Sequence, residues 1–178
     1  LLLSDSIARE AFRMANQAIA YSQKSESLNE TYRIDNFEWK PFQIAFQLMC
    51  IPSFSEEGEG IDIESRDEMD LLWFPTGGGK TEAYLGLIAL VVLLRRMRGL
   101  EGRGRATSVM MRYTLRTLTN QQFQRACKLM IALENIRKTN PSLGNDRFTI
   151  GQIISIFDFF FFAAVVICFY LFYFFKKQ

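Results

Sequence analysis

The sequence contains no histidine, and this absence excludes several kinds of site. A Ser-His-Asp triad needs an imidazole base, and histidine is the commonest metal ligand. Cysteine is scarce as well: Cys50, Cys127 and Cys168 lie far apart, without the spacing of a zinc site. An odd, scattered set of thiols favours a reducing compartment over a disulfide framework. We therefore expect a cytoplasmic protein whose chemistry depends on neither histidine nor disulfides.

The sequence also lacks a strong charge imbalance and an initiating methionine. The formal net charge is +2 over 178 residues, so electrostatics alone do not indicate a nucleic-acid partner. The length suffices for one domain with a sizeable core. The apolar run at residues 1–3 is too short for a signal peptide, and Asp5 follows closely. We expect the chain to begin inside a longer protein.

The most informative stretch is residues 71–81, Leu-Leu-Trp-Phe-Pro-Thr-Gly-Gly-Gly-Lys-Thr. Phosphate oxygens must approach backbone N–H groups closely, which favours glycine in the loop. Lys80 would neutralise the β- and γ-phosphates of ATP, and the Thr81 hydroxyl would hold Mg²⁺. The alternative is a glycine-rich turn with an incidental lysine. The pattern predicts a Walker A site for ATP and Mg²⁺, with Lys80 and Thr81 as its catalytic residues. The predicted ATP-binding residues of this stretch are Pro75, Thr76, Gly77, Gly78, Gly79, Lys80, Thr81 and Glu82.

Hydrophobic periodicity predicts alternating helices and strands around this loop. The expected helices cover residues 5–24, 42–50, 81–97 and 117–138, and the expected strands cover 70–74 and 106–113 and begin again at 148–150. The order strand, helix, strand, helix, strand predicts a parallel sheet with right-handed crossovers and flanking helices. Its site would lie at the carboxyl ends of the strands. We divide the chain into a helix and linker (1–36), an ATP-binding domain (37–152) and an apolar tail (153–178).

Three motifs in order give the sequence a resemblance to superfamily 2 helicases. Residues 39–43, Trp-Lys-Pro-Phe-Gln, are similar to the element upstream of the helicase P-loop, residues 74–81 to motif I, and residues 111–122 to motif Ia. Phe74 stands where the general P-loop pattern has glycine, which suits the helicase variant of the motif. More narrowly, residues 70–87 resemble the helicase-related proteins of prokaryotic DISARM anti-phage systems. The resemblance covers roughly residues 8 to 151.

The resemblance implies a partial RecA-like P-loop domain that drives translocation on DNA with ATP. It implies that Gln43 reads the adenine edge, a role that uses a donor and an acceptor together. It assigns contacts with the nucleic-acid backbone to Arg112, Thr114, Arg116 and Gln121. In the alternative interpretation, Gln43 is an ordinary polar residue of an amphipathic helix and the arginines are a solvated strand end. The implied partners are DNA, the missing downstream helicase domains and other defence-system proteins.

The chain holds only part of the machinery that a helicase needs for ATP hydrolysis. Hydrolysis requires a downstream acidic motif that orients Mg²⁺ and water, and an arginine at the γ-phosphate. The sequence contains neither, so we expect an ATP-binding fragment of a hydrolase that is inactive alone. Two alternatives remain open. One is a membrane-tethered P-loop ATPase of another class, such as a DNA-transfer or transport motor, and the other is a non-functional truncated product.

The C-terminal tail departs from the helicase pattern. Residues 153–175 carry a single charge, Asp158, before Lys176 and Lys177. As one long apolar helix this segment would measure about 34 Å, enough to cross a bilayer. Two interpretations compete: a transmembrane helix that makes the protein membrane-associated, or an out-of-frame or truncated end. We favour the second, because Phe, Ile, Tyr, Leu and Lys dominate the segment, as A/T-rich codons would give.

Overall fold

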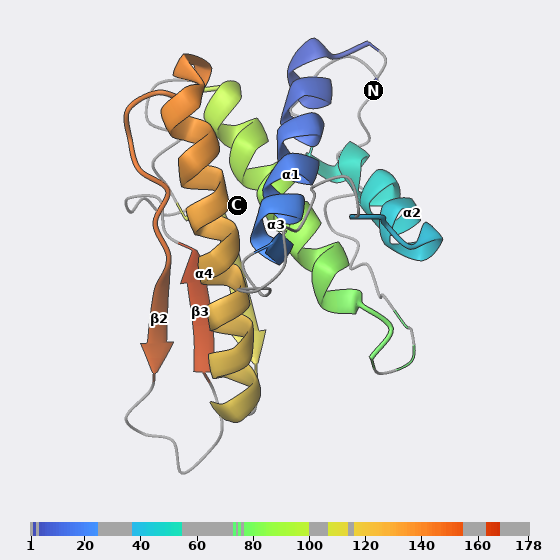
Figure 1. Cartoon of the computed structure of the whole chain (residues 1–178), viewed down its shortest axis with the longest axis vertical. Helices are drawn as coiled ribbons and strands as arrows, with labels where there is room; N and C mark the ends of the chain where they lie inside the picture. The colour runs from blue at the N-terminus through green and yellow to red at the C-terminus, as the bar shows by residue number, and fades with distance from the viewer. Residues whose placement is uncertain are drawn as a thin grey trace, which may run out of the picture.

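The computed structural model describes residues 2, 4–24, 37–54, 73, 75, 77–99, 107–113, 116–154 and 163–167. Four α-helices dominate this part of the chain (Figure 1). They are α1 (Ser6–Lys24), α2 (Pro41–Cys50), α3 (Lys80–Met97) and α4 (Arg116–Thr139). Short 3₁₀ turns follow α2 and α4, at η2 (Ile51–Phe54) and η5 (Pro141–Leu143). The strands are β1 (Val109–Tyr113), β2 (Gly151–Ile154) and β3 (Ala163–Ile167).

Helix α1 packs through a face of small residues against both α3 and α4. The side chains of this face recur every three or four residues, which is the period of one helix face. Alanines dominate it, so the neighbouring helices can approach closely. Its fully or almost fully buried members are Ala8, Ala11, Met14, Ala15, Ala18 and Ile19. This helix confirms the one predicted over residues 5–24.

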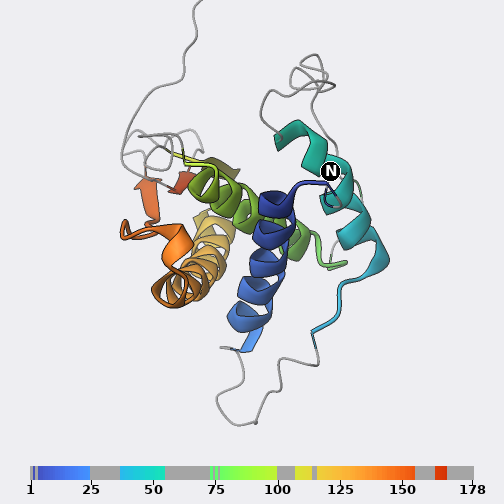
Figure 2. The ribbon, with the colours of Figure 1, turned by 90° about the horizontal axis from the view of Figure 1, so that it is seen from above.

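Helix α3 forms the centre of the molecule (Figure 2). It contacts α1, α2 and α4, and it is apolar around most of its circumference, as expected for a helix buried on several sides. Its buried residues are Ala83, Leu85, Gly86, Ile88, Ala89, Leu90, Val92, Leu93 and Leu94. The helices predicted over 42–50, 81–97 and 117–138 correspond to α2, α3 and α4 within one residue at each end.

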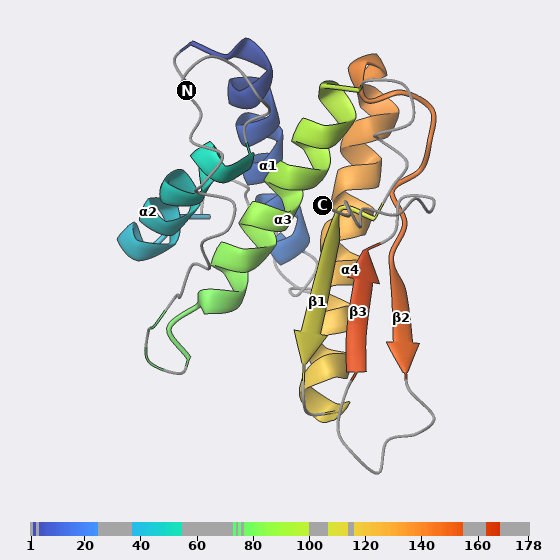
Figure 3. The same cartoon turned by 180° about the vertical axis from the view of Figure 1, so that it is seen from behind.

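The three strands form one antiparallel sheet, and the predicted parallel sheet is wrong (Figure 3). The strand order is β1-β3-β2, with Met111 opposite Val165 on one side of β3 and Gln152 opposite Val165 on the other. Strands β1 and β2, which α4 connects, do run in the same direction. However, β3 lies between them and runs the opposite way, so no two neighbouring strands of the described sheet are parallel. The expected partial RecA-like fold rested on that parallel sheet and is corrected with it.

The apolar tail does not form the long helix that we expected. Within residues 153–175, the described residues 153–154 belong to β2 and 163–167 to β3. An apolar run does not by itself distinguish a helix from a buried strand, and the β-branched Val165, Val166 and Ile167 favour a strand. In the described part of the chain, no helix is both long enough and apolar enough to cross a membrane.

The strand predicted over residues 70–74 lies largely outside the described residues. Trp73 alone is described there, in no regular element, with 83% of its surface exposed. The strand predicted over 106–113 is confirmed only over Val109–Tyr113, as β1: residues 107 and 108 lie in no regular element, and Ala106 is not described. The strand predicted to begin at 148–150 begins at Gly151.

Candidate phosphate-binding loop

Two residues of the glycine run have a backbone conformation that residues with a side chain rarely adopt. Gly77 has φ 79° and Gly79 has φ 95°, both in the left-handed region that L-residues with a Cβ rarely adopt. The Gly78 N–H donates to the Pro75 carbonyl oxygen at 3.2 Å, which closes the turn. Thr76, also predicted to bind ATP, lies outside the described residues. The predicted loop is therefore a tight, glycine-dependent turn.

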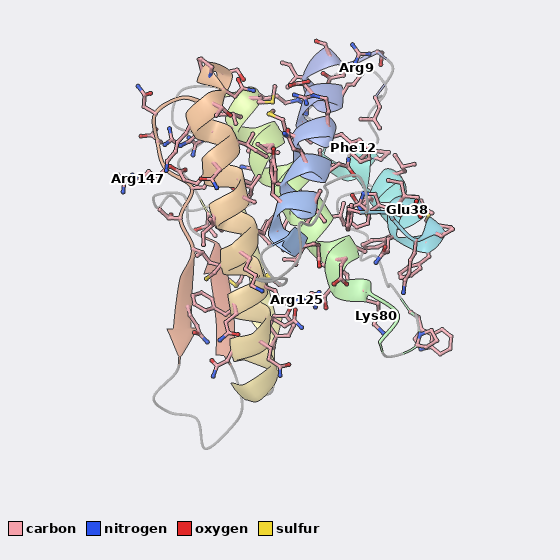
Figure 4. All side chains as sticks on the ribbon, in the orientation of Figure 1. Arg9, Phe12, Glu38, Lys80, Arg125 and Arg147 are labelled. Carbon is pink, nitrogen blue, oxygen red and sulfur yellow. The ribbon has the colours of Figure 1, made fainter. Side chains whose placement is uncertain are left out.

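The loop leads directly into the N-terminus of α3, which begins at Lys80. The first four N–H groups of a helix have no intrahelical partner, and the helix dipole adds positive potential there. Lys80 and Thr81 occupy this first turn and are half-buried. The Lys80 Nζ donates to the Pro75 carbonyl oxygen at 3.4 Å, so the lysine lies over the loop (Figure 4). The Lys80 ammonium and the Thr81 hydroxyl thus lie at the N-terminus of α3, the end of a helix that attracts anions.

Helix α2 contacts the loop through its own first turn. The Gln43 side chain is 4% exposed, and its Nε2 donates to the Gly79 carbonyl oxygen at 2.7 Å. Its Oε1 accepts the Lys40 N–H at 2.8 Å. The Lys40 Nζ donates to the Gly78 carbonyl oxygen at 3.0 Å. Both ends of the Gln43 amide are thus engaged with backbone groups, and the adenine contact assigned to it stays a prediction.

A charged pair joins the loop end of α3 to α4. The Glu82 carboxylate, in the first turn of α3, pairs with the guanidinium of Arg125, and Figure 4 shows Arg125 on the side of α4 that faces this turn. Sequence reasoning placed Glu82 among the nucleotide contacts and missed Arg125. The two residues are 43 positions apart, and no local pattern links them. Lys40 stood within a recognised motif, but nothing in the sequence indicated its contact with Gly78.

Three of the four predicted nucleic-acid residues belong to β1 and α4. Arg112 is exposed on β1 and Gln121 is exposed on α4, while Arg116 is the first residue of α4. Thr114 lies outside the described residues. Figure 3 shows the end of β1, the start of α4 and the start of α3 at one end of the fold. The structure therefore gathers these segments at one end of the fold, and their contact with nucleic acid stays a prediction.

Strand β1 also contacts α3. Burial raises the pKa of the Tyr113 hydroxyl, and the neighbouring Tyr84 raises that pKa further. Tyr113 is the last residue of β1, and Tyr84 lies one turn beyond Lys80 in α3. The strand end predicted to contact nucleic acid thus lies near the first turns of α3.

Comparison with known proteins gives one clear relationship. The chain is similar to the DISARM protein DrmA of Bacillus paralicheniformis. The two are 38% identical over 136 residues, which cover 73% of this chain but only 12% of that protein. This similarity to DrmA confirms the resemblance to the DISARM proteins, and leaves membership of helicase superfamily 2 a prediction. No protein-family model and no solved structure matches the chain.

Proposed function

We propose that residues 75–82 bind the triphosphate of ATP with Mg²⁺. We further infer that the chain is the nucleotide-binding part of a helicase-related protein in a DISARM-type phage-defence system. The observation that carries the proposal is the left-handed turn at Gly77 and Gly79, which leads straight into Lys80 at the start of an 18-residue helix. The similarity to DrmA supports the assignment to a defence system.

The chemistry of the loop suits a polyphosphate. Backbone N–H groups at the start of α3 would donate to phosphate oxygens, and Lys80 would exchange the Pro75 carbonyl for the β- and γ-phosphates. In the described residues, no cluster of three or more His, Cys, Asp or Glu could hold a metal ion. Mg²⁺ would therefore arrive with the nucleotide, held by the Thr81 hydroxyl, phosphate oxygens and water.

We extend the proposal to DNA because of the polar residues at the end of β1 and the start of α4. Arg112 is exposed near the end of β1, and Gln121 is exposed near the start of α4. A contact between Arg112 and a phosphate of a DNA strand would give salt-dependent affinity without sequence preference. The chain spans about an eighth of the relative's length, so the rest of such a protein would supply the other DNA contacts and the hydrolytic groups. Other proteins of the defence system are the remaining proposed partners.

A titration with a fluorescent ATP analogue and Mg²⁺ tests the binding site. We expect Lys80→Ala to weaken binding by about 10- to 100-fold, because it removes hydrogen bonds between a cation and phosphate. Lys138→Ala is the matched control: it removes the same charge from an exposed position in the last turn of α4. The control should bind like the wild type. Equal affinities of the wild type and Lys80→Ala would refute the assignment of the loop.

A further inference from the structure

Two carbonyl groups of the loop accept hydrogen bonds from the first turn of α2 and from Lys40, the residue before it. The Lys40 Nζ donates to the Gly78 carbonyl oxygen at 3.0 Å, and the Gln43 Nε2 donates to the Gly79 carbonyl oxygen at 2.7 Å. Gln43 is itself fixed, because its Oε1 accepts the Lys40 N–H and its side chain is almost fully buried. Lys40, just before α2, and Gln43, in its first turn, thus hold two consecutive peptide groups of the glycine run.

Because each peptide group is planar, a hydrogen bond that fixes its carbonyl also fixes the direction of its N–H. In a trans peptide, the carbonyl of one residue and the N–H of the next point in opposite directions. The described residues contain no cis peptide bond. Holding the Gly78 carbonyl therefore turns the Gly79 N–H away from α2, and holding the Gly79 carbonyl does the same for the Lys80 N–H. Both N–H groups thus point away from the two side chains that hold their peptide groups.

We propose that Lys40 and Gln43 form a peptide clamp that positions the phosphate-binding N–H groups of Gly79 and Lys80. They are positioning residues and need not touch the nucleotide. The inference rests on the proposed function of the loop. Glycine peptides reorient easily because no side chain restricts them, so an unclamped loop would lose conformational freedom on binding. Fixing the donors beforehand removes that cost and tightens binding.

Gln47 provides an internal control on the same face of α2. It lies one turn after Gln43, is 1% exposed, and contacts α3 at Gly86 instead of the loop. Its Nε2 has no hydrogen-bond partner in the described part of the chain. Gln47→Met keeps a similar volume and removes the unpaired amide, so it alters the α2–α3 contact and leaves both clamp bonds in place.

The test compares the binding of three Mg²⁺-bound ligands: ATP, GTP and inorganic tripolyphosphate. The variants of the whole chain are Gln43→Met, Lys40→Met, Lys40→Arg and Gln47→Met. Because the clamp acts on the donors to phosphate, we expect Gln43→Met and Lys40→Met to weaken all three ligands alike. The expected loss is about 3- to 10-fold for each variant, equivalent to one hydrogen bond. Lys40→Arg keeps a donor and should restore binding, and Gln47→Met should bind like the wild type.

Comparison of the affinities for the three ligands distinguishes the clamp from a direct contact between Gln43 and the base. A loss confined to ATP in Gln43→Met would mean that Gln43 reads the base, which overturns the clamp and leaves the phosphate site intact. Unchanged affinities in both Met variants would also overturn the clamp alone. If the wild type binds none of the three ligands, the proposed function fails together with the clamp. Lys40 is exposed, so Lys40→Met keeps the test decisive even if Gln43→Met does not fold.

An NMR measurement supplies a readout that a general packing role would not give. A hydrogen bond to a carbonyl polarises the amide of the same peptide group, so its loss shifts the signal of the next residue's N–H. Gln43→Met should shift the Lys80 amide signal, and Lys40→Met should shift the Gly79 amide signal, both in the absence of ligand. Gln47→Met should move neither signal. Signals that stay unchanged in the two clamp variants would contradict the proposed geometry.

Discussion

At the residue scale, the contact between α2 and α3 depends on a glycine that sequence patterns gave no reason to single out. Gly86 lies inside the apolar helix α3, where glycine is unfavourable relative to alanine by about 1 kcal/mol. A Cβ built on Gly86 would lie 2.8 Å from both the Nε2 and the Oε1 of Gln47. The missing side chain therefore leaves room for the buried Gln47 amide against α3.

The close approach predicts the effect of Gly86→Ala on stability. The added methyl would force the Gln47 amide to shift, and because that side chain is buried, overpacking of this kind costs about 1–3 kcal/mol. We expect a net decrease in the free energy of unfolding, measured in urea, although alanine is the better helix former. The double variant Gly86→Ala/Gln47→Ala should recover much of the loss, because the two residues are in contact. A Gly86→Ala protein as stable as the wild type would show that the buried Gln47 amide can move aside without cost.

At the element scale, one carboxylate ties the start of α1 to the end of α3. The Asp5 Oδ1 accepts the N–H groups of Ile7 at 2.9 Å and Ala8 at 3.0 Å, which caps α1. Its Oδ2 pairs with the guanidinium of Arg98, the C-terminal cap of α3. The hydrogen bond from Ala8 and the pairing with Arg98 lower the pKa of the Asp5 carboxyl, and partial burial opposes them. The two helices that form most of the core are thus joined at one end by an ionised group.

The lowered pKa of Asp5 predicts a pH-dependent contribution to stability. Because the folded-state pKa lies below the ordinary value of 3.8, the stabilisation is complete above that value and disappears as the pH falls through the folded-state pKa. We expect Asp5→Ala to lower the free energy of unfolding by about 1 kcal/mol at neutral pH. The difference from the wild type should shrink below about pH 4. Asp5→Asn keeps a cap and should lose less, whereas a difference that does not change with pH would argue against the ionised cap.

At the scale of the whole molecule, the sequence predicted what local patterns determine. The four helices follow from apolar residues at helical spacing, and their ends agree with prediction because caps and glycines are local signals. The left-handed turn at Gly77 and Gly79 was predictable in the same way, since glycine there serves a backbone need. These features depend on residues within a few positions of one another.

The predictions that were wrong, and the contacts that were not predicted, depend on pairing between distant segments. The strands β1 and β2 have the directions that a crossover through α4 predicts, but nothing in their sequences indicates that β3 separates them. An apolar tail is compatible with a helix or a strand, and pairing with β1 and β2 decided the outcome. The contacts of Lys40 with Gly78 and of Arg125 with Glu82 also span many residues. Tertiary pairing, and not local preference, determined each of these.

The most direct test of the account is the structure of the chain with a non-hydrolysable ATP analogue and Mg²⁺. We predict the triphosphate within hydrogen-bonding distance of the N–H groups of Gly79 and Lys80, with the Lys80 Nζ moved from the Pro75 carbonyl to a phosphate. Gln43 should remain bonded to Gly79. A groove of about 640 Å³ between α1 and α4, with the cationic Arg13 and Lys128 in its lining, is the alternative location. A triphosphate found in that groove, with none at the loop, would contradict the account.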